Sequence, residues 1–233
     1  MKPKLISFKI CPFVQRAVIA MQTKGVEFDI EYIDLAEPPA WFLEISPLKK
    51  VPLLLVGDQV IFESAVINEY IDEAYPNTLH PVDLVEKAHN RSWIEFGNSC
   101  MWNAFHLSVK AGKDEFFTAR EALWNSLDQL EKVVEGPLFN NDQLSLVDVS
   151  YAPMFQRLQF LHNIFPEIFD EARHPKVNAW KDHLLTLDVV RTSTVSDIES
   201  LYSQLIFKRQ GYIAQFLDSS LYEFVETSSE GTY

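Results

Sequence analysis

A cysteine near the start of the chain has the surroundings of a reactive thiol. Cys11 is followed by Pro12, and the segment from Pro12 to Lys24 has the pattern of a helix. Proline suits the first turn of a helix, so Cys11 is expected at the helix's amino-terminal end. The unpaired N–H groups there favour a thiolate, the reactive form of cysteine, and Arg16 and Lys9 are further sources of positive charge. We therefore predict thiolate chemistry at Cys11, with a pKa below the ordinary value of about 8.5.

The alternative for Cys11 is an inert, buried cysteine, which is the commoner role of a lone cysteine. We favour the reactive interpretation, because a packing cysteine rarely stands at a strand-to-helix junction with proline next to it. The second cysteine, Cys100, shares helical spacing with Trp93 and Phe96 and is expected to serve packing. Val14 occupies the position of the second thiol in a dithiol motif, which excludes dithiol chemistry inside this segment.

The elements that position Cys11 alternate between strand and helix over the first 75 residues. The apolar periodicity and the Gly57-Asp58 turn signal predict a βαβ unit, a hairpin and a closing helix. The expected elements are strand Lys4 to Phe8, helix Pro12 to Lys24, strand Phe28 to Ile33, helical turn Ala40 to Ile45, strands Val51 to Val56 and Gln59 to Phe62, and helix Ser64 to Ala74.

A proline-containing segment, Tyr75 to Pro81, interrupts the helical pattern and is typical of a linker. From Leu84 onward the apolar spacing is helical almost throughout. Ser145 and Asp148 have the spacing of a capping box, which predicts the start of a buried central helix. The expected division is an α/β domain over 1–76, a linker over 77–83 and an all-helical domain over 84–233 that ends in a polar tail from Glu226 to Tyr233.

Composition narrows the possible partners and cofactors. The chain has 233 residues, is 47% hydrophobic and carries a formal net charge of −13, which would repel nucleic acid and anionic lipid. No apolar run approaches the roughly 20 residues of a membrane helix, so stable membrane insertion is not expected. The sequence has no metal-binding motif such as HExxH or Cys-x-x-Cys, and no metal is expected. Two cysteines without a secretory signal predict a reducing compartment, the cytoplasm.

Four segments occur together in an order and spacing that have a counterpart in a known family. They are Cys11-Pro12-Phe13-Val14-Gln15-Arg16, Lys50-Val51-Pro52, Phe62-Glu63-Ser64-Ala65 and Tyr70-Ile71-Asp72-Glu73-Ala74-Tyr75-Pro76. In these segments the chain resembles the cysteine-type glutathione transferases, most closely the omega class and dehydroascorbate-reductase-like relatives. The resemblance covers the first 80 residues and the Ser145 to Asp148 box, whereas beyond Thr186 only helical character agrees. It implies a thioredoxin-like amino-terminal domain followed by an α-helical carboxy-terminal domain.

The resemblance also implies how Cys11 meets glutathione, the expected co-substrate. Cys11 would form a mixed disulfide with it, and Phe13 would line its groove. Val51 precedes Pro52, which the family holds in cis, so that the Val51 backbone pairs with the cysteine of glutathione in a strand-like manner. The alternative for Pro52, an ordinary proline of an edge strand, is less favoured because the cysteine motif lies nearby.

The same resemblance implies contacts to the ends of glutathione. Glu63 would accept a hydrogen bond from the γ-glutamyl ammonium, and Ser64 would bind the γ-glutamyl carboxylate. Ser64 is also a good helix cap, and both roles are compatible. The lysine that the omega pattern places before a Pro-x-Trp segment is missing here, where Pro38 stands in its place, so Lys50 or its neighbour Lys49 is the candidate for the glycyl carboxylate. A solvated loop lysine remains the alternative for Lys50.

A second-substrate pocket is expected between the two domains, where Met101, Trp102 and Phe105 cluster on a helix. The same residues suit the core of a helix bundle, and taken singly each is better explained in that way. The implied enzyme is a glutathione transferase of the thioltransferase or dehydroascorbate reductase type. It would act as a homodimer on a small electrophile or disulfide. The alternative is a non-catalytic protein of the same fold, regulatory like the stringent starvation proteins or membrane-associating like the chloride intracellular channels.

Overall fold

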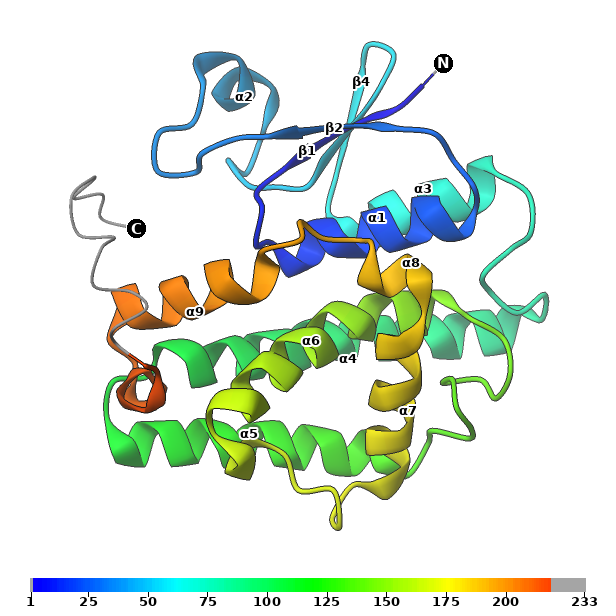
Figure 1. Ribbon diagram of the computed structural model, residues 1–233. Helices are drawn as coiled ribbons and strands as arrows, with labels where there is room; N and C mark the ends of the chain where they lie inside the picture. The colour runs from blue at the N-terminus through cyan, green and yellow to red at the C-terminus, as the bar shows by residue number, and fades with distance from the viewer. Residues whose placement is uncertain (1, 219–233) are drawn as a thin grey trace.

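The computed structural model describes residues 2–218, with a small mixed sheet at one end and a helical part below it (Figure 1). The first part contains β1 (Lys4–Ser7), α1 (Pro12–Thr23), β2 (Asp29–Tyr32), α2 (Ala40–Ile45), β3 (Leu53–Val56), β4 (Gln59–Phe62) and α3 (Ser64–Ala74). The second part contains α4 (Leu84–Val109), α5 (Lys113–Glu131), α6 (Leu146–Ile164), the 3-10 turn η1 (Pro166–Ile168), α7 (Pro175–Thr186), α8 (Asp188–Arg191), α9 (Ile198–Arg209) and the 3-10 turn η2 (Tyr212–Phe216). The predicted fold class is confirmed.

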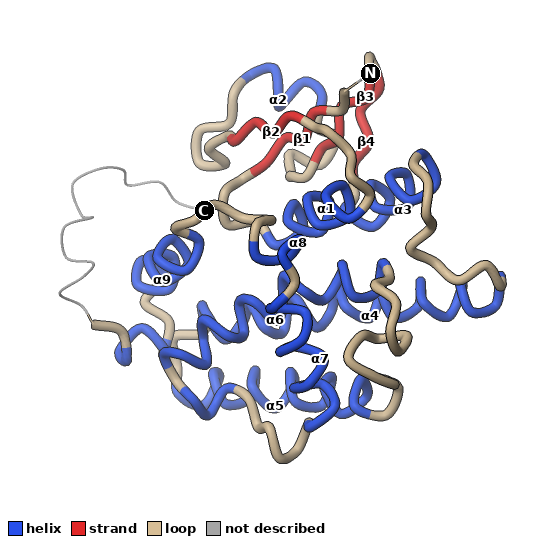
Figure 2. Tube along the Cα trace, turned by 45° about the vertical axis from the view of Figure 1, so that its right-hand side comes forward, coloured by secondary structure: helices blue, strands red, loops and turns tan. Residues whose placement is uncertain are grey.

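The sheet has the strand order β2-β1-β3-β4, in which β1 and β2 are parallel and the other pairs are antiparallel. Leu5 of β1 is buried and lies opposite Ile30 on one side and Leu54 on the other. Helices α1 and α3 pack together below the sheet, and α2 lies above it (Figure 1 and Figure 2).

The predicted elements of this sheet domain correspond closely to the observed ones. The bounds Ala40–Ile45, Gln59–Phe62 and Ser64–Ala74 are those expected, and β3 is the main difference because it begins at Leu53 instead of Val51. Proline has no N–H to donate to a strand ladder, so the ladder starts after Pro52.

Helix α1 joins the two parts of the molecule. It packs against α3 on one side and against α6 and α8 on the other (Figure 2). All residues from Val14 to Met21 are buried, which includes the polar Gln15 and Arg16. The amino-terminal end of α1, with Cys11, therefore lies beside the helical part.

Helix α6 forms the centre of the helical part, and its predicted capping box is present. The buried Asp148 carboxylate accepts hydrogen bonds from the Ser145 N–H (2.8 Å) and hydroxyl (2.6 Å), the Phe139 N–H (2.8 Å) and the Trp180 indole N–H (2.7 Å). The domain limits at 76 and 84 stay a prediction, although α3 ends at Ala74 and α4 begins at Leu84. The expected polar tail, Glu226 to Tyr233, lies outside the described residues.

Candidate active site

Cys11 occupies the N-cap position of α1 with an extended backbone, φ −70° and ψ 117°. Its N–H donates to the Phe8 carbonyl at 2.9 Å, which holds the turn between β1 and the helix. Pro12 stands in the first helical turn, as predicted. Cys11 is partly exposed, and its Sγ lies 4.0 Å from the Val51 carbonyl oxygen, to which the thiol donates.

The electrostatics of Cys11 differ from the expectation based on the helix end alone. Burial is the largest influence and raises the pKa of the Cys11 thiol. The backbone N–H groups of Val14 and Phe13 and the charges of Arg157 and Arg16 lower this pKa without reversing the shift. The prediction of a pKa below the ordinary value is therefore wrong for the protein without a ligand, because desolvation exceeds the attraction of the helix end.

The Val51-Pro52 peptide bond is cis, as the resemblance implied, and both residues are buried. The preceding turn is held by Ser46, whose hydroxyl accepts from the Lys50 N–H at 3.1 Å and donates to the Lys50 carbonyl at 3.3 Å. The Lys50 residue is exposed at this turn. The structure thus brings Val51 to Cys11 and leaves the Lys50 ammonium toward solvent.

Glu63 and Ser64 stand at the amino-terminal end of α3. Glu63 is the exposed N-cap residue with φ 69°, and its carbonyl accepts from the Ile67 N–H at 2.9 Å. Ser64 is the first helical residue and is buried, with its hydroxyl oxygen 3.4 Å from Nη1 of Arg16. The first N–H groups of a helix have no partner within it, so this end of α3 attracts anions.

Two buried arginines flank the end of α1. Burial lowers the pKa of Arg16 and of Arg157 to about 10 each, so both remain charged at neutral pH. Arg157 of α6 donates to the Ile10 carbonyl at 3.2 Å and to the Gln15 side chain, which ties the helical part to the Cys11 loop. Sequence reasoning missed Arg157. Its signal was a charged residue within a helix whose neighbours, such as Phe155 and Leu158, are apolar.

The predicted second-substrate residues separate in the structure. Trp102 is 52% exposed, and its ring centroid lies 6.1 Å from that of Phe13 and 5.9 Å from that of Phe105. Trp102 therefore lies between Phe105 and Phe13, which follows Cys11 by two positions in the sequence. Met101 is buried in the core instead, because successive residues of a helix point in different directions and Met101 faces inward where Trp102 faces outward.

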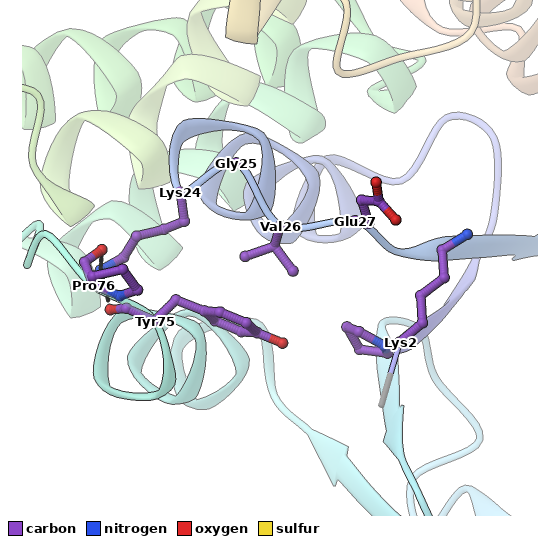
Figure 3. Close-up of a pocket in the computed structure, with 8 residues that line it drawn as sticks. Lys2, Lys24, Gly25, Val26, Glu27, Tyr75 and Pro76 are labelled. Atoms are coloured by element: carbon purple, nitrogen blue, oxygen red, sulfur yellow. Dashed lines mark hydrogen bonds between the residues drawn. The ribbon is translucent and has the colours of Figure 1, made fainter.

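A cavity of about 490 Å³ has a lining that does not include Cys11 (Figure 3). It is bordered by Lys2, by the turn at Gly25 and by Tyr75, whose ring lies along one side of it (Figure 3). The Lys24 ammonium at its edge is already bound to Asp72 and to the carbonyls of residues 72 and 75–77. The Lys24 ammonium is therefore not free to bind a ligand in this cavity.

Two further searches cover the same described residues. No three His, Cys, Asp or Glu side chains between residues 2 and 218 gather as a metal site requires. No helix in this range combines the length and apolar character of a membrane span.

Comparisons with known proteins agree on one family. Residues 10–74 match the family model described as "Glutathione S-transferase, N-terminal domain", and residues 69–182 match "Glutathione S-transferase, C-terminal domain". The chain is 30% identical over 211 residues to glutathione S-transferase omega-1 of Rattus norvegicus, with 86% of each chain covered. It is 32% identical over 151 residues to a probable glutathione S-transferase DHAR2 of Oryza sativa, covering 64% of this chain and 52% of that one. The rice GST1 structure in complex with glutathione has a TM-score of 0.76 at 25% identity, covering 90% of this chain and 96% of that one.

Proposed function

Because the chain belongs to the glutathione S-transferase family, we propose that it is a glutathione-dependent thiol transferase or reductase in which Cys11 forms a mixed disulfide with glutathione. The observation that carries the proposal is the position of the Cys11 sulfur, at the end of α1 and 4.0 Å from the Val51 carbonyl. A ligand cysteine that pairs with the Val51 backbone would lie beside this sulfur.

The proposed reaction has two exchange steps. The Cys11 thiolate attacks the glutathionyl sulfur of a disulfide substrate, the substrate's sulfur–sulfur bond breaks, and the released thiolate takes up a proton. The thiolate of a second glutathione then attacks the Cys11 mixed disulfide, which releases oxidised glutathione and regenerates Cys11. The two electrons come from glutathione, and no resolving cysteine is needed at Val14.

The surroundings of Cys11 support this chemistry. The Phe13 and Val14 N–H groups and the Arg157 and Arg16 guanidiniums all favour the thiolate and oppose the effect of burial. A thiol with a raised pKa is mostly protonated at neutral pH, so the alkylation rate of the free protein should keep rising with pH beyond the ordinary pKa of a cysteine thiol. We propose that glutathione occupies the site before the Cys11 thiol loses its proton.

The carry-over of the binding roles is part of the proposal. The proposed binding residues lie at the start of α1 (Phe13), just before β3 (Val51 and Pro52) and at the start of α3 (Glu63 and Ser64). This placement suits a tripeptide that extends across these three elements. Lys50 is exposed on that turn, and its flexible ammonium is the proposed partner of the glycyl carboxylate.

The protein is also proposed to be a cytoplasmic homodimer. Four apolar side chains are between 54% and 91% exposed, which suits burial against a second copy: Val66 of α3, Val82 just before α4, and Leu84 and Val85 at the start of α4. Sedimentation as a monomer at micromolar concentration would contradict the dimer. Cell fractionation that recovers the protein with a membrane or an oxidising compartment would contradict the location.

The test combines mass spectrometry of the protein after exposure to oxidised glutathione, a thioltransferase assay and retention on immobilised glutathione. Cys11→Ser should lose both the added glutathionyl mass and the thioltransferase activity. Cys100→Ser is the matched control and should retain both, because Cys100 is buried and burial raises the pKa of its thiol to about 11.

A single assay panel identifies the substrate class. It compares dehydroascorbate, a mixed glutathione disulfide, a glutathionyl hydroquinone and an aryl halide. Full activity of Cys11→Ser on the disulfide would refute the role of Cys11. Absence of binding and of turnover in the wild-type protein would favour the non-catalytic alternative.

A further inference from the structure

Gln15 is a buried polar residue of α1 to which the proposed reaction assigns no role. It lies one turn after Cys11, and its N–H donates to the Cys11 carbonyl at 3.3 Å. Only 2% of its surface is exposed. Its side-chain Nε2 donates to Oγ of Ser193 at 2.9 Å and to Oε1 of Gln156 at 3.0 Å, and its Oε1 accepts from Nη1 of Arg157. The side chain therefore joins α1 to α6 and to the segment that follows α8.

The hydrogen bonds around Gln15 fix the direction of its amide group. The Ser193 hydroxyl donates to the Val190 carbonyl at 2.6 Å, so its oxygen can only accept in the contact with Gln15. The NH2 group of the amide must therefore face Ser193, and the amide oxygen must face Arg157. Gln15 is thereby held as a neutral acceptor for the guanidinium.

Arg157 is a buried cation that only neutral groups hold. It is 3% exposed. Its Nη1 and Nη2 atoms donate to two side-chain amides and two backbone carbonyls, those of Gln15, Gln156, Ile10 and Pro153. In the described part of the chain no carboxylate bonds to it or acts on it electrostatically. A buried cation without an anionic partner carries a desolvation cost, which a negative charge nearby would offset.

Cys11 is the group that can supply this negative charge. Ile10, whose carbonyl accepts from Nη2 of Arg157 at 3.2 Å, directly precedes it. Two acidic groups act on the guanidinium electrostatically, the phenol of Tyr202 on α9 and the Cys11 thiol. Burial raises the pKa of Tyr202, which ordinarily already exceeds that of a cysteine, so the phenol keeps its proton. Ionisation of Cys11 thus places an anion near a cation that the folded protein leaves unbalanced.

We infer that Gln15 is a positioning residue for the reaction at Cys11, because its amide holds the Arg157 guanidinium where the positive charge stabilises the Cys11 thiolate. A neutral amide at this position holds the cation without cancelling its charge, as a carboxylate would do. Ser193 contributes by orienting the amide. The inference rests on the proposed function and adds to it a residue outside the expected contacts with glutathione.

Other charged or titratable side chains around Cys11 stay in place in every variant of the test. Arg16 on α1 acts on the thiol in the same direction as Arg157. Lys9 and Tyr32 border a small cavity that Cys11 also lines. Lys9 is exposed, and burial raises the pKa of Tyr32, so that its phenol stays neutral at neutral pH. Changes at other positions leave these influences constant.

A purely structural role for Gln15, as a link between helices, makes a different prediction. Loss of a link lowers the stability of the fold but does not move the pH at which Cys11 ionises. The experiment therefore measures the rate at which iodoacetamide, a neutral reagent, alkylates Cys11 between about pH 6 and 10. Every protein carries Cys100→Ser, so that Cys11 is the only thiol in the chain.

The variants separate the amide from the charge. Gln15→Met removes the amide without adding a charge, Arg157→Gln removes the cation, and a double variant combines the two. Gln22→Met is the matched control, because Gln22 also lies on α1 and donates to the Thr192 carbonyl at 3.3 Å, but has no hydrogen bond to Arg157. Ser193→Ala removes the acceptor that orients the Gln15 amide, and it keeps the test valid if Gln15→Met does not fold.

Arg157→Gln should slow alkylation at pH 7 about tenfold and Gln15→Met about threefold, with both profiles displaced to higher pH, because the rate follows the fraction of thiolate. Ser193→Ala should displace the profile in the same direction, and Gln22→Met should leave it unchanged. In the Arg157→Gln background, Gln15→Met should have no further effect, since its influence acts through the guanidinium.

An unchanged profile of Arg157→Gln, or of both Gln15→Met and Ser193→Ala, would overturn the inference. Equal slowing by Gln15→Met with and without Arg157 would overturn it as well. The proposed function would still stand in either case if the wild type acquires a glutathionyl mass from oxidised glutathione. A wild type that acquires none would overturn both.

Discussion

The ionic cluster of Glu69, His80 and Arg91 should make the stability of this protein depend on acid pH. Glu69 lies on α3, and its carboxylate receives hydrogen bonds from the His80 ring (Nε2, 2.8 Å) and from Arg91 of α4 (Nε, 2.9 Å). A further hydrogen bond joins its second oxygen to Nη2 of Arg91. The Glu69 side chain is 22% exposed. The substitution Glu69→Gln removes the charge and keeps the shape.

The magnitude follows from the pKa of Glu69. Burial alone would raise this pKa, but the hydrogen bonds and charges of Arg91 and His80 outweigh burial and lower it from 4.5 to about 2. Such a carboxylate contributes about 3 kcal/mol to the free energy of unfolding at neutral pH. The Arg91 side chain is 48% exposed, and solvent screening reduces the expected value to about 2 kcal/mol.

The sign of the pH dependence is that of a depressed carboxyl pKa. The contribution is fully present above pH 4.5, the ordinary pKa of the group, and is lost as the pH falls toward 2. Less than half of it, about 1 kcal/mol, should remain at pH 3.

Urea unfolding followed by tryptophan fluorescence at pH 7, 5, 4 and 3 measures this difference. Glu73→Gln is the matched control, since the Glu73 side chain is 65% exposed and lies 3.7 Å or more from its cationic partners. The control should match the wild type within about 0.5 kcal/mol. The reasoning is refuted if Glu69→Gln is as stable as the wild type at pH 7. It is equally refuted if the difference stays constant down to pH 3, because a packing effect does not titrate.

Three further substitutions test contacts that hold the fold. Lys24→Met should cost about 3–5 kcal/mol in urea unfolding, because it leaves the buried Asp72 carboxylate without its cationic partner; an unchanged midpoint would contradict this. Gly97→Ala places a Cβ 2.9 Å from the Tyr151 ring and should cost about 1–3 kcal/mol by thermal unfolding; a higher melting temperature would exclude the close contact. Asp148→Ala should cost more than about 2 kcal/mol, with partial recovery in Asp148→Asn, because it removes four hydrogen bonds.

Local signals were sufficient for most of the fold. The position of Pro12 indicated the start of α1, and the Ser145 to Asp148 spacing indicated the start of α6. Each depends on residues within one turn of each other, so the sequence contains the whole interaction. The start of β3 differed by two positions, since the apolar pattern does not register the missing N–H of Pro52.

The candidate site was predictable to the extent that it lies on such local signals. Cys11 and Ser64 were found because each begins a helix, and Val51 because it precedes a proline. Arg157 was not found as part of the site, because it is more than 140 positions from Cys11 and approaches it only through the packing of α6 against α1.

The sequence by itself determined which groups stand at the helix ends and that the chain has an α/β part followed by a helical part. Only the tertiary structure decided the direction of the Cys11 pKa shift, because burial depends on everything that packs around the sulfur. It likewise decided that Trp102 meets Phe13 while Met101 enters the core. Helix starts arise from neighbours in sequence, whereas desolvation, such as that of the Cys11 thiol, arises from residues that folding brings together.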